Sequence, residues 1–213
     1  MLHLKSFCFN PFQQNTYLVY NDEGMAFIID PGNSNASENQ ILKNFVEEKK
    51  LTLSRLLLTH AHIDHVLGNR FIFDTYGLLP EMHEADLFFI QRMPESAAMY
   101  GVKAEASPFP QKYLNDGDTI LLGTYAFECI FTPGHSPGSI SFYNSENKLL
   151  IAGDVLFQGS IGRTDLPLAS HDTLMSSIHE RLLVLDDAVK VYSGHGPSTT
   201  IGRERQNNPF LIS

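Results

Sequence analysis

The chain has 213 residues, 43% of them hydrophobic, which is enough for one large domain with its own core, and we expect residues 1–213 to form that domain. Its formal net charge of −9, without any Lys/Arg cluster, excludes nucleic acid as the main partner, because phosphate binding requires a basic surface. The N-terminus lacks the apolar region of a signal peptide and no apolar run approaches the length of a membrane span, so we expect a soluble, cytoplasmic protein without a membrane partner.

Strands and one helix are expected before the first functional motif. Alternating apolar runs at 2–9, 15–20 and 25–29, separated by Asn-Pro and Asn-Asp-Glu-Gly turns, predict a strand meander. A helix with one apolar stripe follows, and either Asn35 or Ser37 can cap it.

Four metal-binding side chains then lie within six residues: His60, His62, Asp64 and His65. Imidazole nitrogens and carboxylate oxygens suit zinc, iron and manganese, and the spacing would arise by chance in roughly one shuffled chain in a thousand. The apolar run that ends at Thr59 predicts a buried strand, so the donors begin at its carboxyl end, where α/β sheets bind ligands. Four adjacent donors would be hard to fold around a single ion, so this geometry favours two neighbouring metals.

The chain continues as an α/β pattern that loses its regularity after residue 92. The sequence predicts a helix over 66–76, a strand over 77–82 and a helix over 84–92. Residues 93–118 are rich in Pro and Ala, and we interpret them either as a loop over the active site or as a connecting segment.

A second run of strands begins at Thr119, with hairpins expected through 123–124 and 145–147, and a helix is expected over 172–185. Two halves that each run from strands to helix predict an α/β protein in which two sheets pack face to face between outer helices, a four-layer αββα sandwich. This packing would bring the loops of both halves to one edge.

Three further donors follow strands of the second half: His135, Asp154 and His195. Each is flanked by Gly or Pro, which permits the sharp turn needed to aim the side chain over the sheet edge. Alone, each would be an ordinary polar turn residue. Together with the first four they predict a metal centre with seven donors.

These motifs resemble those of the metallo-β-lactamase-fold hydrolases, and so does Asp30 in Phe-Ile-Ile-Asp-Pro-Gly. The stretch 159–165 resembles the short bacterial form of the glyoxalase II-like (hydroxyacylglutathione hydrolase) branch of that family. The resemblance implies two divalent metal ions, most simply zinc, with iron or manganese as alternatives. It places His60, His62 and His135 on one metal and Asp64, His65 and His195 on the other. Asp154 would bridge both, and Asp30 would support the ligands from outside. A bridging solvent molecule would be the nucleophile.

The function that the resemblance implies is metal-dependent hydrolysis of a small-molecule thioester, such as S-lactoylglutathione, to an acid and a thiol, with Asp64 as the catalytic residue that orients the nucleophile or takes up its proton. Arg163 resembles a substrate-binding basic position, although a salt bridge to Asp165 is an equal alternative. Larger glyoxalase II enzymes hold glutathione with a C-terminal helical domain for which a chain ending at Ser213 has no room, so thioester hydrolysis is better supported than glutathione as the carrier. The oligomeric state is not indicated.

The main competing function is that of a sulfur dioxygenase of the same fold, which would use a single iron on His60, His135 and Asp154. Ribonuclease, β-lactamase and non-enzymatic binding functions fit the charge, the N-terminus or the donor set less well. Other reactive side chains have simpler roles: His83 as a polar residue after a strand, and His171 with Asp172 as a helix cap. The two cysteines, Cys8 and Cys129, are expected to be free thiols, the second buried in a strand.

Overall fold

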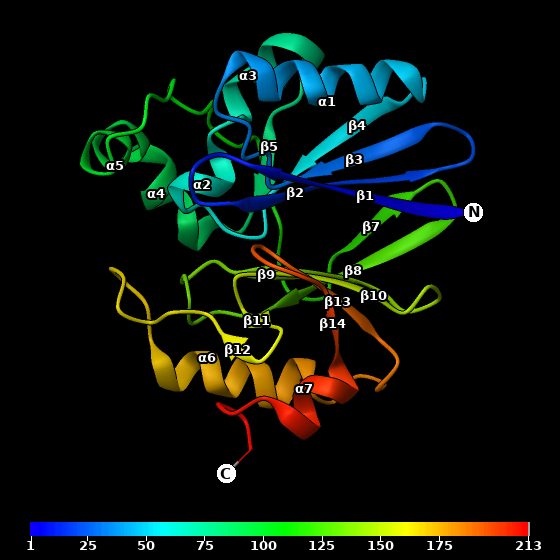
Figure 1. Ribbon diagram of the computed structural model, residues 1–213, viewed down its shortest axis with the longest axis vertical. Helices are drawn as coiled ribbons and strands as arrows, with labels where there is room; N and C mark the ends of the chain where they lie inside the picture. Colours follow the sequence, from blue (N-terminus) through cyan, green and yellow to red (C-terminus); the bar gives the residue numbers. More distant parts are fainter. Residues whose placement is uncertain (213) are drawn as a thin grey trace.

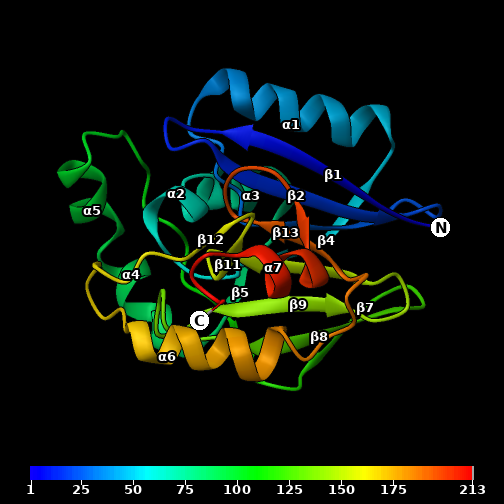
Figure 2. The ribbon, with the colours of Figure 1, turned by 60° about the horizontal axis from the view of Figure 1, so that its bottom comes forward.

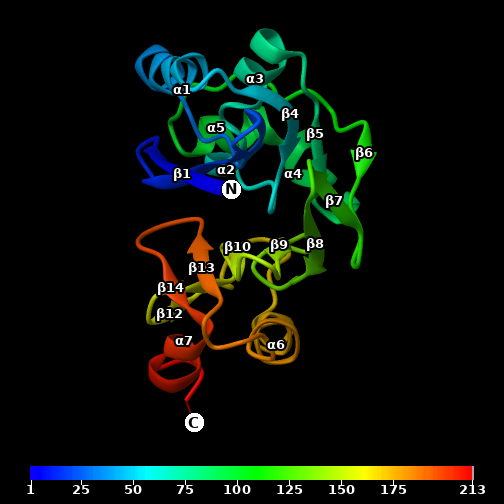
Figure 3. The ribbon, with the colours of Figure 1, turned by 90° about the vertical axis from the view of Figure 1, so that its right-hand side faces the viewer.

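The computed structural model describes residues 1–212, which form two six-stranded sheets packed face to face between outer helices (Figure 1). Turned by 90°, the molecule shows its four layers in the order helix, sheet, sheet, helix (Figure 3). This is the αββα sandwich expected from the sequence.

The first sheet has the order β1-β2-β3-β4-β5-β6. Its first three strands pair antiparallel, as the expected meander, and β3 to β6 pair parallel. The parallel strands therefore end at one edge, where ligand-binding loops collect. The bounds are β1 Leu2–Phe9, β2 Gln14–Asn21, β3 Met25–Ile29, β4 Thr52–Leu57, β5 Pro80–Met82 and β6 Lys112–Tyr113.

The second sheet has the order β14-β13-β10-β9-β8-β7, and only its β10–β13 pair is parallel. Both expected hairpins are confirmed, because β7 turns into β8 and β9 turns into β10. A short hairpin, β11–β12, follows β10. The bounds are β7 Thr119–Leu122, β8 Tyr125–Phe131, β9 Ile140–Asn144, β10 Leu149–Gly153, β11 Leu156–Phe157, β12 Ser160–Ile161, β13 Lys190–Ser193 and β14 Thr199–Thr200.

Helices cover the outer face of each sheet, with α1 and α3 above the first and α6 and α7 below the second (Figures 1 and 3). Figure 2 shows α1 and α6 on opposite sides of the molecule. Asn35 caps α1, since its side chain accepts a hydrogen bond from the Glu38 amide. No helix within residues 1–212 has the length and apolar character needed to cross a bilayer. The bounds are α1 Ala36–Glu48, α2 Ile63–Val66, α3 Asn69–Tyr76, α4 Leu87–Gln91, α5 Met93–Met99, α6 His171–Ser177 and α7 Ile201–Asn207.

Alternating side chains along the strands fill the spaces between the layers. In β2, Leu18 packs under α1, whereas Val19 points into the space between the sheets. In β8, Phe127 and Cys129 point into the same space and Ile130 faces the other way, toward α6. Successive strand residues face opposite sides, and in the centre of β2 both faces are buried, which explains its continuous apolar run. In β8 the inner face is buried, whereas Ala126 and Glu128 on the outer face are exposed and only Ile130 is covered there. Cys129 is fully buried, as expected.

Several expected elements were wrong in extent. The helix expected over 66–76 begins only at Asn69, as α3, and a separate short helix, α2, ends at Val66. The strand expected over 77–82 begins only at Pro80. A 3₁₀ turn, Glu84–Asp86, precedes α4 in the segment expected to be one helix. Residues 93–118 contain α5 and the short strand β6.

The helix expected over 172–185 was also wrong in detail. It begins at His171 and changes at Ile178 to a π-helical turn, Ile178–Leu182. Its cap is Ser170, whose side chain accepts from the Thr173 amide, and so His171 and Asp172 form the first turn instead.

Candidate metal centre

Loops from both sheets bring the seven expected donors together. His60 and His62 follow β4, and Asp64 and His65 lie in the short helix α2. The other three follow strands of the second sheet: His135 after β8, Asp154 after β10 and His195 after β13. The site therefore lies at the edge where the strands of the two sheets end, as the sequence pattern predicts.

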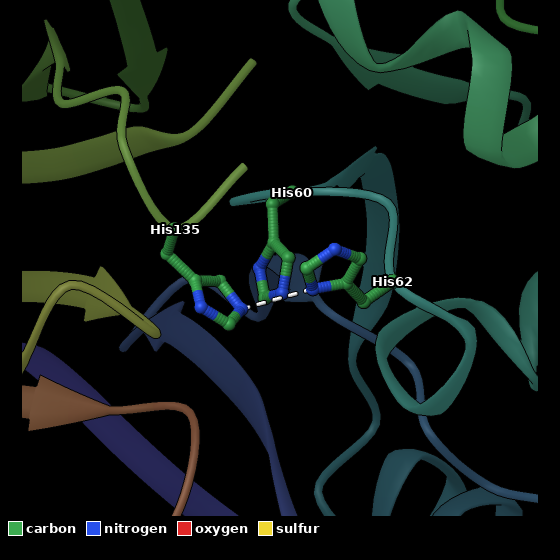
Figure 4. Close-up of side chains that lie close together, drawn as sticks. All are labelled: His60, His62 and His135. Atoms are coloured by element: carbon green, nitrogen blue, oxygen red, sulfur yellow. Dashed lines mark hydrogen bonds between the residues drawn. The ribbon is translucent and has the colours of Figure 1, made fainter. Parts of the chain in front are cut away.

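One group of donors consists of His60, His62 and His135, with ligand nitrogens within 4.8 Å of one another. The three rings face a common point, and His62 Nδ1 lies 2.9 Å from His135 Nε2 (Figure 4). The backbone carbonyl of Arg163 accepts a hydrogen bond from His135 Nδ1 at 2.9 Å, which directs Nε2 toward the other rings.

The second group consists of Asp64, His65 and His195, again with donor atoms within 4.8 Å of one another. Asp64 Oδ2 lies 3.0 Å from His195 Nε2 and 3.5 Å from His65 Nε2. His195 Nδ1 lies 3.1 Å from the carbonyl oxygen of Phe12, in the turn between β1 and β2. Both sheets therefore contribute to this group.

Asp154 lies between the two groups. Its Oδ2 is 3.5 Å from both His135 Nε2 and His195 Nε2, and its Oδ1 is 3.4 Å from His65 Nε2. The neighbouring Gly194 leaves the space this carboxylate needs, since a Cβ there would lie 2.0 Å from Asp154 Oδ1. Asp154 is therefore within 3.5 Å of ring nitrogens from both donor groups.

Asp30 supports the ligands from behind. It directly follows β3 and has a positive φ of 50°, and its Oδ2 lies 3.0 Å from His65 Nδ1. Both of its oxygens accept hydrogen bonds from Thr59, the residue before His60. Asp30 also forms a close group with His60 and His65, but these hydrogen bonds already occupy its oxygens. It therefore fixes the orientation of the ligands.

Unpaired polar atoms show that this pocket fits a cation. The Nε2 atoms of His60 and His65 and Oδ1 of Asp154 are buried without a hydrogen-bond partner among residues 1–212. Leaving a buried polar atom unpaired costs about 1–3 kcal/mol, so three within the donor groups call for a ligand that takes electron pairs. The donor set implies a divalent metal site.

The electrostatics suit this assignment. Burial lowers the pKa of His62 to about 3, helped by the neighbouring His135, and burial lowers the pKa of His60 as well. Neutral imidazole is the form that binds metal. Burial opposes ionisation of Asp64 and Asp154, but His65 and His195 together outweigh it and lower the pKa of both carboxyls. The acidic donors are therefore ionised. Although burial acts in the opposite direction, the same carboxylates raise the pKa of His65, and that of His195 to about 10, so a metal ion would have to displace a proton from each of these two rings.

Asp86 is a residue of the site that the sequence did not reveal. It is fully buried, and its carboxylate accepts from the Ala61 amide at 2.8 Å, the Ser136 hydroxyl at 2.8 Å and the Gly138 amide at 2.6 Å. It thus joins the loop of His60 and His62 to the loop of His135. Burial raises the pKa of its carboxyl to about 6, although all three hydrogen bonds act in the opposite direction. Asp86 could have been found from its position, because it follows β5, which pairs parallel with β4 and therefore ends at the same edge of the sheet.

Arg163 and His83 lie outside the donor groups. The Arg163 guanidinium donates to both oxygens of Asp165 at 2.7 Å, which is the salt-bridge alternative weighed from the sequence, and its side chain lies at the mouth of the cavity described next. The ring of His83 stacks on Phe131 with 4.4 Å between ring centroids, and its Nδ1 accepts from the Ala85 amide. His83 is thus a polar residue after a strand, as expected.

A cavity of about 480 Å³ opens onto the metal centre. Its floor includes His62, Asp64, His135, Asp154 and His195. The walls come from α4, from α5 and from the segment after β12. The first part of the 93–118 segment therefore does cover the site, whereas β6 pairs with β5 in the sheet.

The fold and this donor set define a metal-dependent hydrolase. The chain belongs to the metallo-beta-lactamase superfamily, whose model matches residues 9–195. It is 42% identical over 208 residues to the hydroxyacylglutathione hydrolase GloC of Haemophilus influenzae, and the match covers 95% of this chain and 94% of GloC. The resemblance to the short glyoxalase II-like branch is thereby confirmed.

Two solved structures have a similar fold over nearly the whole chain. The BLEG-1 B3 metallo-beta-lactamase superposes with a TM-score of 0.91 at 37% identity, covering 99% of this chain and 100% of that one. TTHA1623, solved in a di-iron-bound form, superposes with a TM-score of 0.87 at 37% identity, covering 97% and 100%.

Proposed function

We propose that this metal-dependent hydrolase cleaves thioesters of small molecules to an acid and a thiol. The observation that carries the proposal is the arrangement of seven donors in two groups that share Asp154. The name of the relative GloC, a hydroxyacylglutathione hydrolase, supports the thioester as the bond that is cleaved. We take residues 1–213 as a single domain with this one function.

Each donor has a proposed role. His60, His62 and His135 would hold one divalent cation, Asp64, His65 and His195 the other, and Asp154 both. When bound, such cations lower the pKa of a water molecule and polarise a carbonyl oxygen. Asp64 is the proposed catalytic residue, because its carboxylate lines the cavity and remains ionised, so that it can orient a water molecule and accept its proton.

Arg163 is the proposed contact for an anionic part of a substrate, since it lies at the cavity mouth. Its ion pair with Asp165 competes with that role. We therefore expect its contribution to substrate binding to be small.

Zinc is the proposed metal, because it suits imidazole and carboxylate ligands. The di-iron form of TTHA1623 makes iron the competing metal. The competing activity, persulfide oxidation at a single iron, requires only His60, His135 and Asp154. It would leave Asp64, His65 and His195 gathered nearby without a role, and so the second donor group favours hydrolysis.

The test compares the two reactions on one preparation. Protein loaded separately with zinc and with iron would be offered S-lactoylglutathione and a simple acetyl thioester, with thiol release recorded. The same samples would be offered glutathione persulfide, with oxygen uptake recorded. The proposal expects metal-dependent thiol release, and oxygen consumption without thioester hydrolysis would refute it.

A further inference from the structure

We propose that the cavity beside the metal centre binds an apolar alkyl or aryl group of the thioester, of medium length, in preference to a glutathione carrier. This inference rests on the proposed thioester hydrolysis and specifies its substrate class. It is carried by the residues that line the cavity and by the pairing of the charges around it.

The walls of the cavity are mostly apolar, although Glu95 and Ser96 of α5 also line it. Phe88 and Phe89 from α4 and Met93 and Met99 from α5 form one side, and Leu166 and Pro167 contribute to the cavity from the segment after β12. The wall reaches the metal centre directly, because the ring of Phe89 lies 4.8 Å from the ring of His62. An acyl group whose carbonyl lies over the donors would therefore extend along these side chains. The volume of about 480 Å³ is in the range of small-molecule sites.

Apolar side chains at the mouth are exposed. Met99 is 81% exposed and Phe88 39% exposed. Tyr100, which follows α5, makes an edge-on contact with Phe12 from the β1–β2 turn, with 5.7 Å between ring centroids. This contact joins α5 to the N-terminal sheet. An apolar ligand that covered Met99 and Phe88 would remove this surface from water, which favours binding.

The charges around the cavity do not suit glutathione, which carries two carboxylates. Apart from the donor groups, Arg92 and Arg163 are the positively charged side chains that line the cavity within residues 1–212. Arg92 lies over the ring of Phe88, 5.0 Å from its centroid, and its Nε is 3.7 Å from the carboxylate of Glu95. Arg163 donates hydrogen bonds from Nε and Nη2 to Asp165. Each guanidinium therefore already has a carboxylate partner, with which the carboxylates of glutathione would have to compete.

The test uses two series that differ only in chain length. The first measures kcat/KM for acetyl, butanoyl, hexanoyl and octanoyl thioesters of the neutral thiol N-acetylcysteamine, with S-lactoylglutathione for comparison. The second measures, by calorimetry on the metal-loaded protein, binding of the corresponding free carboxylates. We expect both kcat/KM and affinity to rise about threefold for each added methylene up to hexanoyl, and S-lactoylglutathione to be a poorer substrate than the hexanoyl thioester.

Two variants test whether the apolar side chains at the cavity mouth cause the dependence of kcat/KM on chain length. Met99→Ser and Phe88→Ser should each reduce the octanoyl-to-acetyl ratio of kcat/KM at least threefold. Leu121→Ser is the matched control, since Leu121 is 62% exposed on β7 and does not line the cavity, and its ratio should equal that of the unmodified protein.

The outcomes separate this inference from the proposed function. Thioester hydrolysis without any dependence on chain length, or with a preference for the glutathione thioester, would overturn the inference and leave the proposed function intact. If no thioester were cleaved but carboxylate affinity rose with chain length, the apolar site would stand and the proposed reaction would be wrong. If the affinity for carboxylates did not change with chain length, the inference would be wrong, whether or not the protein cleaved thioesters.

Discussion

Replacing Asp86 by Ala should weaken both the fold and the metal site. The substitution leaves the amides of Ala61 and Gly138 buried without an acceptor, at about 1–3 kcal/mol each. The removal of a buried carboxylate offsets part of this cost, since burial raises its pKa and thus disfavours the charge. We therefore expect a net loss of about 2–4 kcal/mol in the free energy of unfolding, measured by urea denaturation of the metal-free protein.

Asp86→Ala should also lower the affinity for metal, beyond what the loss of stability alone would cause. Asp86 joins the loop of His60 and His62 to the loop of His135, so its loss should reduce metal affinity by roughly 10- to 100-fold, measured by competition with a chelator of known affinity.

Glu204→Ala provides the matched control. Glu204 is also a buried carboxylate with three hydrogen-bond donors, from Gly159, Thr199 and Asn208, and none of these residues belongs to a ligand loop. Glu204→Ala should therefore destabilise the fold similarly and leave metal affinity unchanged. Equal losses of affinity in the two variants would refute the assigned role of Asp86.

Further predictions concern the proposed catalytic residue Asp64, Arg163 and the two thiols. Asp64→Asn should lower kcat for thioester hydrolysis by about 100-fold or more, measured at determined metal content, and full activity would exclude Asp64 as the proton acceptor. Arg163→Ala should raise KM for S-lactoylglutathione by no more than about threefold with little change in kcat, because Asp165 already pairs with the guanidinium. Asp165→Asn should lower that KM, and an unchanged KM in both variants would remove Arg163 from the site. One thiol of the native protein, Cys8, should react quickly with a thiol reagent while the other stays protected, because burial raises the pKa of Cys129 to about 12 and its side chain is enclosed. If both thiols reacted quickly before denaturation, the buried position of Cys129 in β8 would be wrong.

The layers and the positions of the donors were predictable because both depend on local patterns. Short continuous apolar runs, as in β4 and β10, indicate strands between two layers, and polar residues directly after them indicate the edge where those strands end. His60 and His195 could thus be placed together although 135 positions separate them.

Other features depend on contacts between distant residues, which a local pattern does not contain. The helix expected over 66–76 is interrupted where Gly68 packs against the segment after β3. The amide of Gly68 donates to the Pro31 carbonyl at 2.7 Å, and a Cβ at Gly68 would lie 2.1 Å from Asn33 Oδ1. Asp86 was missed for the same reason, since its partners lie 25 to 52 positions away.

Metal content per chain is the measurement that tests the central claim most directly. Elemental analysis after loading with excess zinc and removal of free metal should give two ions per chain in the unmodified protein. Asp154→Ala should reduce both occupancy and thioester hydrolysis, because Asp154 lies between both donor groups. His83→Ala, which alters a histidine stacked on Phe131, should retain both ions and full activity. One ion per chain under metal excess, or equal losses in the two variants, would contradict the shared two-metal centre.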